Sequence, residues 1–219
     1  VSDGSSVLGL GNLGAEGAIP VMEGKAILFK ELAGVDAFPI CLRTQDADGI
    51  VEAVKNIAPV FGGINLEDIA APKCFEVEEK LKKELNIPVM HDDQHGTATV
   101  VLAALINALK LRKSKKEKVR VVINGAGAAG NAVAGLLLKF GFKNITLVDS
   151  HGAIYEGRRH LDEYKRSLAK RTNKAKVKGG LSRCLEGADV FIGVSRAGLL
   201  TPGMIRKMNA KPGIFAMAN

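Results

Sequence analysis

The chain has no tryptophan and only two tyrosines in 219 residues, and its three cysteines, Cys41, Cys74 and Cys184, are widely spaced. An odd number of scattered cysteines fits neither a disulfide framework nor a CxxC zinc site. Few aromatic rings argue against a platform for stacking single-stranded nucleic acid. No apolar run reaches the roughly 20 residues of a membrane span, and the N-terminus has no signal-peptide pattern. We therefore expect a soluble, cytoplasmic protein with reduced cysteines and no membrane partner.

Acidic and basic side chains are unevenly distributed along the chain. Residues 1–109 contain 16 Asp and Glu against 8 Lys and Arg, whereas residues 110–219 contain 7 against 23. This asymmetry suggests two parts with different ligands. The basic excess lies in 110–120 and 158–178, and nucleic-acid binding is one interpretation of it. Solvated helix faces and loops explain such stretches more often, so we expect no nucleic-acid partner.

Short β-branched runs alternate with longer helical patterns. In the first half we expect strands at 35–42, 62–69 and 87–93 and helices at 46–61, 73–85 and 96–111. In the second half we expect strands at 118–125, 144–150, 188–195 and 213–219, with a helix ending near 141. This alternation predicts the α/β class, with parallel sheets covered by helices. The lysine-rich stretch 112–118 divides the prediction into two domains: a parallel-sheet substrate- and metal-binding domain, 1–111, and a Rossmann-type doubly wound dinucleotide-binding domain, 112–219.

The stretch VVINGAGAAG satisfies G-x-G-x-x-G between an expected strand and an expected helix. The glycine-rich turn comprises Gly125, Ala126, Gly127, Ala128, Ala129 and Gly130. In such a turn the first glycine permits a tight bend, the second lets the backbone approach a pyrophosphate, and the third allows close helix packing. Free N–H groups at the start of the helix then bind the anion. A glycine-rich turn that binds nothing is the alternative.

Asp149 ends the next expected strand, 19 residues after Gly130, close to the spacing of about 20 for a ribose-binding carboxylate. Such a carboxylate accepts a hydrogen bond from the ribose 2′-hydroxyl and repels a 2′-phosphate, which favours NAD over NADP. Arg158 and Arg159 follow closely and could offset this preference. NAD is the expected cofactor, with NADP as the alternative.

Four carboxylates follow two neighbouring strands of the first half. INLEDI contributes Glu67 and Asp68, and HDD contributes Asp92 and Asp93. Like charges at adjacent strand ends need a cation, and an all-oxygen donor set suits Mg²⁺ or Mn²⁺. The alternative is that Glu67 and Asp68 cap the helix starting near Pro72, while one of the two aspartates caps the helix at Gly96.

Lys25 lies among apolar neighbours in IPVMEGKAILFK, on an expected helix. Partial burial would lower the pKa of this lysine and make it a base near neutral pH. A lysine that merely extends its amine to water from an amphipathic helix is the alternative.

Five stretches closely resemble the malic enzymes, particularly the shorter bacterial and archaeal type. They are VSDGSSVLGLGNLG, IPVMEGKAILFK, FGGINLEDIAAPKCF, IPVMHDDQHGTA and INGAGAAG, in family order across essentially the whole chain. The resemblance implies oxidative decarboxylation of (S)-malate to pyruvate and CO₂, with NAD or NADP, a divalent metal, and assembly as a homodimer or larger homo-oligomer.

The resemblance also implies roles for particular residues. Lys25 matches the general base and Asp92 its hydrogen-bonded partner, while the metal ligands match Glu67, Asp68 and Asp93. Asn219 matches an asparagine near substrate and nicotinamide.

The chain departs from the family pattern in two respects. The tyrosine general acid belongs to a segment before Val1, so the chain resembles the central part of a longer protein. Its own tyrosines, Tyr155 and Tyr164, both lie beyond Asp149. Ser6 stands where many members carry an arginine that binds the substrate carboxylate.

Two other functions remain open from the sequence. One is another two-domain NAD(P) dehydrogenase acting on an amino acid or a folate, although such enzymes need no metal. The other is a catalytically silent domain that senses NAD.

Overall fold

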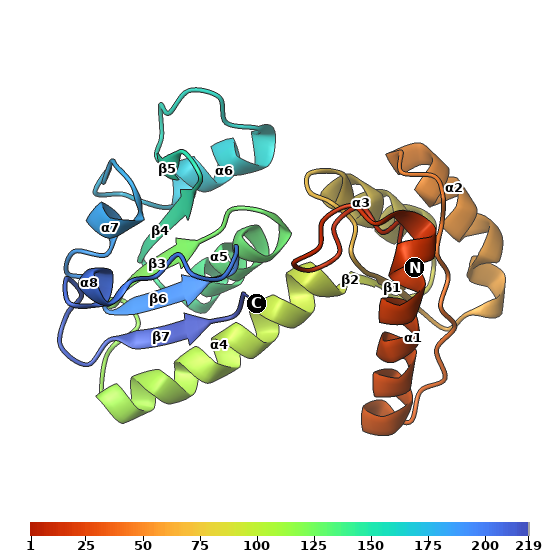
Figure 1. Cartoon of the computed structure of the whole chain (residues 1–219), viewed down its shortest axis with the longest axis horizontal. Helices are drawn as coiled ribbons and strands as arrows, with labels where there is room; N and C mark the ends of the chain where they lie inside the picture. The colour runs from red at the N-terminus through yellow and green to blue at the C-terminus, as the bar shows by residue number, and fades with distance from the viewer. Residues whose placement is uncertain (219) are drawn as a thin grey trace. The chain divides into compact units, whose positions relative to one another are not determined.

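The computed structural model describes residues 1–218 and divides into two compact units, Val1–Asp93 (unit 1) and Gln94–Asn219 (unit 2) (Figure 1). Residue 219 lies outside the described residues. Within 1–218, no helix has both the length and the apolar character needed to cross a bilayer.

Unit 1 contains a small parallel sheet with three helices. Its elements are α1 (Gly14–Ala33), α2 (Ala47–Ile57), the 3₁₀ turn η1 (Ala58–Val60), β1 (Ile64–Leu66), α3 (Lys73–Glu84) and β2 (Val89–His91). The strands pair in parallel, with Leu66 opposite His91. This register brings the residues that follow β1 beside those that follow β2. The carboxylates after both strands therefore lie at the same edge of the sheet.

Helix α4 (Asp92–Arg112) begins directly after β2. Its buried side chains Val101, Leu105 and Leu109 belong to the main apolar core of unit 2. For this reason the division between the compact units falls near the start of α4, whereas the predicted domain boundary follows residue 111 at its end. The boundary at 111/112 stays a prediction about the functional domains.

Unit 2 is built on a five-stranded sheet. Its elements after α4 are β3 (Arg120–Asn124), α5 (Ala128–Phe140), β4 (Asn144–Asp149), β5 (Gly152–Ala153), α6 (Glu163–Arg171), α7 (Leu181–Cys184), β6 (Val190–Gly193), α8 (Pro202–Ile205) and β7 (Gly213–Ala216). The strand order is β5-β4-β3-β6-β7, and all pairs are parallel except β4 with β5. The chain leaves β3 for β4 on one side and reaches β6 on the other. The carboxyl end of β3 is thus the switch point where such sheets bind ligands.

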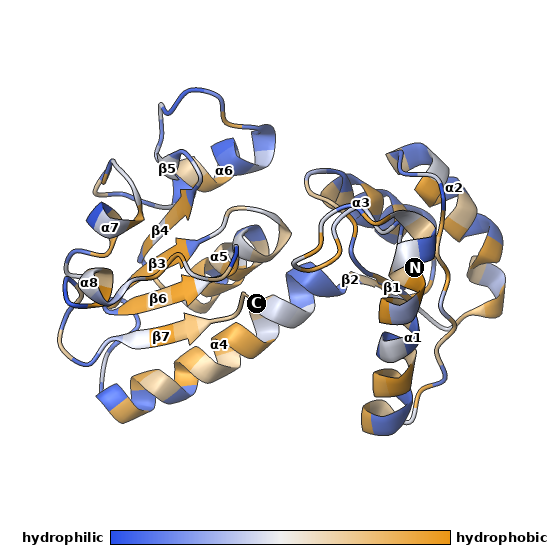
Figure 2. Ribbon diagram, viewed as in Figure 1, coloured by the Kyte–Doolittle hydropathy of each residue, from blue (hydrophilic) through white to orange (hydrophobic). Residues whose placement is uncertain are grey.

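Both faces of this sheet are covered by helices. On one face Val121 and Ile123 pack in a core with α4, α5 and α6. On the other face Val122 and Phe191 pack with residues of and around α7 and α8. The strands are accordingly apolar along most of their length (Figure 2). The predicted α/β class with parallel sheets and a Rossmann-type unit is confirmed.

Two predicted elements differ from the structure. The strand expected at 35–42 is reduced to a single bridge between Ser2 and Cys41. Pro39 has no N–H to donate to a ladder, and only Ile40 and Leu42 exchange backbone hydrogen bonds with Ser2. The helix expected at 96–111 begins earlier, at Asp92, so both aspartates of HDD lie in its first turn. The remaining predicted strands are present with shorter bounds.

Candidate active site

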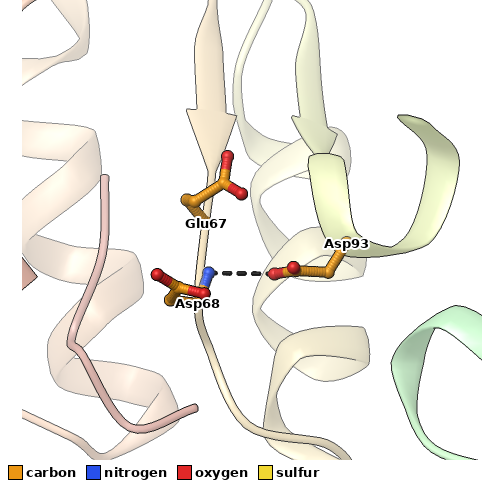
Figure 3. Close-up of side chains that lie close together, drawn as sticks. All are labelled: Glu67, Asp68 and Asp93. Carbon is orange, nitrogen blue, oxygen red and sulfur yellow. Dashed lines mark hydrogen bonds between the residues drawn. The ribbon is translucent and has the colours of Figure 1, made fainter. Parts of the chain in front are cut away.

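The carboxylate cluster, defined here as Glu67, Asp68 and Asp93, lies where β1 ends and α4 begins (Figure 3). Each side chain offers one oxygen, and the three oxygens lie within 4.8 Å of one another. Glu67 and Asp68 are buried and Asp93 is half-buried. The sequence predicted that carboxylates converge at adjacent strand ends, and the register of β1 with β2 produces that convergence.

An unusual backbone conformation turns Asp68 into the cluster. Its φ of 55° lies in the left-handed region, which few residues other than glycine adopt. The backbone N–H of Asp68 donates to Asp93 Oδ2 at 2.9 Å, which ties the two chain segments together (Figure 3). Asp68 Oδ2 is buried and has no hydrogen-bond partner among the described residues. A strained turn that carries a buried, unpartnered carboxylate oxygen is typical of a ligand site.

Burial and mutual repulsion make two of these carboxyl groups weak acids. Burial, followed by the charge of Asp93, raises the pKa of Glu67 to about 7. The same two causes raise the pKa of Asp68 to about 6. A cation among the three side chains would remove both penalties, because it replaces lost hydration and screens the repulsion.

The donor set fits a hard divalent cation. Octahedral Mg²⁺ with oxygens at about 2.1 Å places neighbouring ligand atoms about 3 Å apart and opposite ones about 4 Å apart. The oxygens of the cluster fall within 4.8 Å of one another, so small side-chain movements suffice. Glu67, Asp68 and Asp93 could therefore hold Mg²⁺ or Mn²⁺, and no sulfur or nitrogen ligand is among them.

Helix α1 brings Lys25 to the same place. Its Nζ donates to Asp92 Oδ2 at 2.7 Å and lies 3.1 Å from Glu67 Oε2. The prediction that burial lowers the pKa of Lys25 is wrong for this arrangement. Burial does act in that direction, but the hydrogen bond to Asp92 and the charges of Glu67 and Asp92 outweigh it, so the pKa lies above its ordinary value. A divalent cation bound to Glu67 would oppose these carboxylates and lower the pKa again.

Sequence reasoning missed Asn65. Its side-chain amide donates to Glu67 Oε2 at 3.0 Å, so the carboxylate that faces Lys25 is held from both sides. Residues two apart in a strand point to the same face, and this signal was available in INLED.

The loop before α1 also contacts the cluster. The backbone N–H of Ser6 donates to the carbonyl oxygen of Asp68 at 2.9 Å, and Ser5 Oγ accepts from the N–H of Ala70 at 2.9 Å. The backbone of Leu8 hydrogen-bonds the Asp68 carboxyl group, which acts to lower its pKa against the larger effect of burial. Ser6, the position that departs from the family pattern, is thus part of the support of the cluster.

Lys25 and Asn65 also line a cavity of about 470 Å³ within unit 1. Its other walls include Met22, Phe29 and Phe38, and no member of the carboxylate cluster lines it. Of the residues around the carboxylate cluster, Lys25 and Asn65 thus reach this cavity, whereas the three carboxylates do not.

The glycine-rich turn of unit 2 has the geometry that its sequence predicts. Gly125 has φ of 120°, and a Cβ there would lie 2.7 Å from the carbonyl oxygen of Val194. A Cβ on Gly130 would lie 1.9 Å from the carbonyl oxygen of Gly125. At Gly127 a Cβ would meet nothing within 4 Å, so this position faces open space.

Helix α5 begins immediately after Gly127, which gives no side-chain cap. The N–H groups of the first helical turn, Ala128 to Gly130, have no partner within the helix. Together with the open space at Gly127, they form a cradle for an anion such as a pyrophosphate. Ala126, within the turn, is buried.

Asp149 ends β4, next to β3, as the spacing predicts. It is not a free carboxylate, because the guanidinium of Arg158 donates to both of its oxygens, at 2.9 and 2.5 Å. The backbone N–H of His151 donates to Oδ1 at 2.9 Å. Burial acts to raise the pKa of Asp149, but these bonds outweigh it, so the pKa lies below its ordinary value.

Other sequence-predicted residues lie elsewhere. Asn219, expected near substrate and cofactor, lies outside the described residues. Tyr155 and Tyr164 belong to unit 2, the first after β5 and the second in α6. The cysteines form no disulfide, as expected.

The fold and these sites define an α/β protein with a Rossmann-type unit and a cluster of three carboxylates beside a lysine. Comparison with known families gives the same result. Residues 1–47 and 43–82 match the malic enzyme N-terminal domain, and residues 94–219 match the malic enzyme NAD binding domain. The chain therefore belongs to the malic enzyme family.

Individual relatives agree with this assignment. The chain is 59% identical to the bifunctional malic/malolactic enzyme of Bacillus subtilis and 58% identical to the NAD-dependent malic enzyme of Geobacillus stearothermophilus, with 100% of the chain aligned. It covers 54% and 46% of those proteins, so it spans about half the length of the curated relatives it matches. Proteins named NADP-dependent malic enzyme are 46–48% identical to it.

A solved structure shares the fold. The NAD-dependent malic enzyme of Thermotoga maritima superposes with a TM-score of 0.96 at 55% identity, over 99% of this chain and 58% of that one.

Proposed function

We propose that the protein containing this chain catalyses the oxidative decarboxylation of (S)-malate to pyruvate and CO₂, with reduction of NAD and a requirement for Mg²⁺ or Mn²⁺. The observation that carries the proposal is the contact of Lys25 Nζ with Asp92 and Glu67 at the edge of the carboxylate cluster. A base beside a cation site is what removal of a hydroxyl proton from a metal-chelating 2-hydroxy acid requires. The family membership of both units supports the choice of malate.

In this proposal Glu67, Asp68 and Asp93 hold the divalent ion, which would bind the substrate hydroxyl and carboxylate and lower the hydroxyl pKa. Lys25 accepts the hydroxyl proton while hydride leaves C2 for the nicotinamide. Asp92 orients the lysine amine through their 2.7 Å hydrogen bond and stabilises the ammonium that forms. Oxaloacetate then loses its C4 carboxyl group to give enolpyruvate.

The remaining step is protonation of enolpyruvate at C3, which needs a general acid. The family resemblance gives that role to a tyrosine outside residues 1–219, so no residue of this chain is proposed for it. In unit 2, the glycine-rich turn and Asp149 are proposed to hold the pyrophosphate and adenosine ribose of the nucleotide. Asn219 is proposed to lie near substrate and nicotinamide.

The test is NADH formation by the intact protein with malate and Mn²⁺, with and without EDTA. Lys25→Ala should lower kcat by about 10²- to 10⁴-fold, the contribution typical of a positioned acid or base. Lys30→Ala is the matched control on the same helix, because its amine pairs with the exposed Asp36. Turnover that survives EDTA, or in Lys25→Ala at the control's rate, would refute the assignment. NADH binding without malate turnover would instead favour a silent NAD-sensing domain.

We also propose a cytoplasmic homodimer or larger homo-oligomer. Support comes from α1, where Ile27, Leu28 and Leu32 are 52–82% exposed, more than an isolated surface helix needs. Sedimentation of the intact protein tests this proposal. A monomer at micromolar concentration would contradict it, whereas an oligomer that Leu32→Glu dissociates would support this helix as its interface.

A further inference from the structure

We propose that Arg158 is a positioning residue for nucleotide selection: it holds Asp149 in a fixed orientation that accepts a ribose 2′-hydroxyl, and it is itself committed to this contact rather than to a 2′-phosphate. The inference deepens the proposed function and rests on it only in assuming that unit 2 binds a dinucleotide. Sequence reasoning left the role of the two arginines after Asp149 open.

The guanidinium of Arg158 makes four hydrogen bonds through its two terminal nitrogens. Nη1 and Nη2 each donate to one oxygen of Asp149, and Nη1 also donates to the carbonyl oxygens of Gly152 and Ala153, at 2.9 and 3.1 Å. Because the two carbonyls belong to β5, they fix the arginine independently of the carboxylate. Such a two-point pair sets the plane of the carboxylate as well as its charge.

Burial shows that the pair is built into the fold. The side chains of Arg158 and Asp149 are only 11% and 12% exposed. An arginine available to bind a phosphate would expose its N–H groups to water. In Arg158, by contrast, Nη1 and Nη2 already donate to oxygens of the protein.

The remaining hydrogen-bonding capacity of Asp149 matches a hydroxyl. A carboxylate has about four acceptor sites, and Arg158 and the N–H of His151 take three of them. The remaining site can accept one hydroxyl proton. A 2′-phosphate carries only hydrogen-bond acceptors and negative charge, so the Asp149 carboxylate repels it. The N–H donors of Arg158 that could bind the phosphate instead point to Asp149.

The experiment measures dissociation constants of NADH and NADPH for the intact protein, by nucleotide fluorescence without malate. Arg158→Met should lower the affinity for NADH about tenfold, which corresponds to the loss of one well-aligned hydrogen bond to a charged group. It should lower the affinity for NADPH less. Asp149→Asn should raise the affinity for NADPH relative to NADH, because it removes the counter-ion of the arginine. Arg158→Lys should bind NADH more weakly than the unmodified protein, because an ammonium keeps the charge without the two-point contact.

Arg159→Met is the matched control, since Arg159 is exposed and adjacent in the chain. Thermal unfolding of each variant identifies changes that come from misfolding. A loss of NADPH affinity with NADH unchanged in Arg158→Met would make the arginine a phosphate ligand and overturn the proposal, and equal losses for both nucleotides would overturn it as well. If Arg158→Lys binds NADH with unchanged affinity, a positive charge alone is enough to position Asp149, and the proposed role of the two-point contact is refuted.

These readouts are separate from turnover. A protein that binds NADH but does not oxidise malate refutes the proposed function and leaves this inference standing. If the protein oxidises malate while its Arg158 variants keep the same nucleotide preference, only the inference about Arg158 is refuted. If the protein binds neither NADH nor NADPH, the inference about Arg158 is refuted as well.

Discussion

The glycines at 127 and 130 lie three residues apart, and the structure predicts opposite outcomes for the same substitution. At Gly127 an added Cβ meets nothing within 4 Å, and φ is −83°, which alanine adopts freely. Gly127→Ala should therefore change the free energy of unfolding by less than about 1 kcal/mol, because a slightly poorer helix N-cap is offset by a stiffer unfolded chain. At Gly130 the added Cβ would lie 1.9 Å from a backbone oxygen, where ordinary contacts begin at 3.4 Å.

Relieving that overlap requires the turn and the helix to separate. Gly130→Ala should therefore lose about 3 kcal/mol or more of stability. Gly127→Ala should fold normally but weaken NADH binding about 100-fold or more, close to 2.7 kcal/mol, because its methyl group stands where the pyrophosphate approaches the backbone.

Urea unfolding and NADH titration of the intact protein measure both effects. The informative variant is Gly127→Ala, since it separates binding from folding. If it binds NADH as tightly as the unmodified protein, the turn does not hold the pyrophosphate and the reasoning fails. If Gly127→Ala is destabilised as much as Gly130→Ala, the space beside residue 127 does not accommodate a methyl group.

Four further predictions concern unit 1. Affinity for Mn²⁺ should rise about twentyfold from pH 6 to pH 8, because Glu67 and Asp68, with pKa values of about 7 and 6, must lose their protons to bind the ion; calorimetry that finds equal affinity at both pH values would contradict this. The sign is opposite for stability without metal: the folded Glu67 holds its proton more tightly than the unfolded one, so the free energy of unfolding should fall as pH rises from 4.5 to 7. Asn65→Ala should weaken Mn²⁺ binding several-fold without unfolding the protein, because Glu67 loses a 3.0 Å hydrogen bond, and unchanged affinity would count against that support. Asp3→Asn should lower stability by about 3 kcal/mol in urea unfolding, since Asp3 is fully buried and pairs with Lys73, whereas a change below about 1 kcal/mol would show that the pair contributes little.

The geometry that was predicted correctly is the part whose constraints are local. The three glycines of the turn are fixed by backbone sterics within six residues, so their pattern determines the conformation. Glu67 and Asp93 meet because carboxyl ends of parallel strands share an edge, and that rule needs only the two strands. The α/β class follows from the same alternation.

The features that were missed depend on pairing across the sequence or on competing energies. Lys25 and Asp92 are 67 residues apart, and only the fold shows that the carboxylates around the lysine outweigh its burial. The strand expected at 35–42 is not formed, because Pro39 interrupts the ladder and only the bridge between Ser2 and Cys41 remains. The start of α4 was misjudged because two aspartates were interpreted as the end of a strand, although carboxylates also suit the first turn of a helix.

The proposed nucleotide site of unit 2 consists of two parts that differ in how freely evolution can alter them. The turn depends on backbone approaching backbone, and at Gly125 and Gly130 no side chain fits, so this part is closed to mutation. The contact of Asp149 with Arg158 is made by two side chains nine residues apart, and the carbonyls that support it belong to main chain that any sequence supplies. With the proposed roles of Asp149 and Arg158, a descendant can exchange one or two residues there and change its electron carrier, while the sheet and the turn are inherited unchanged.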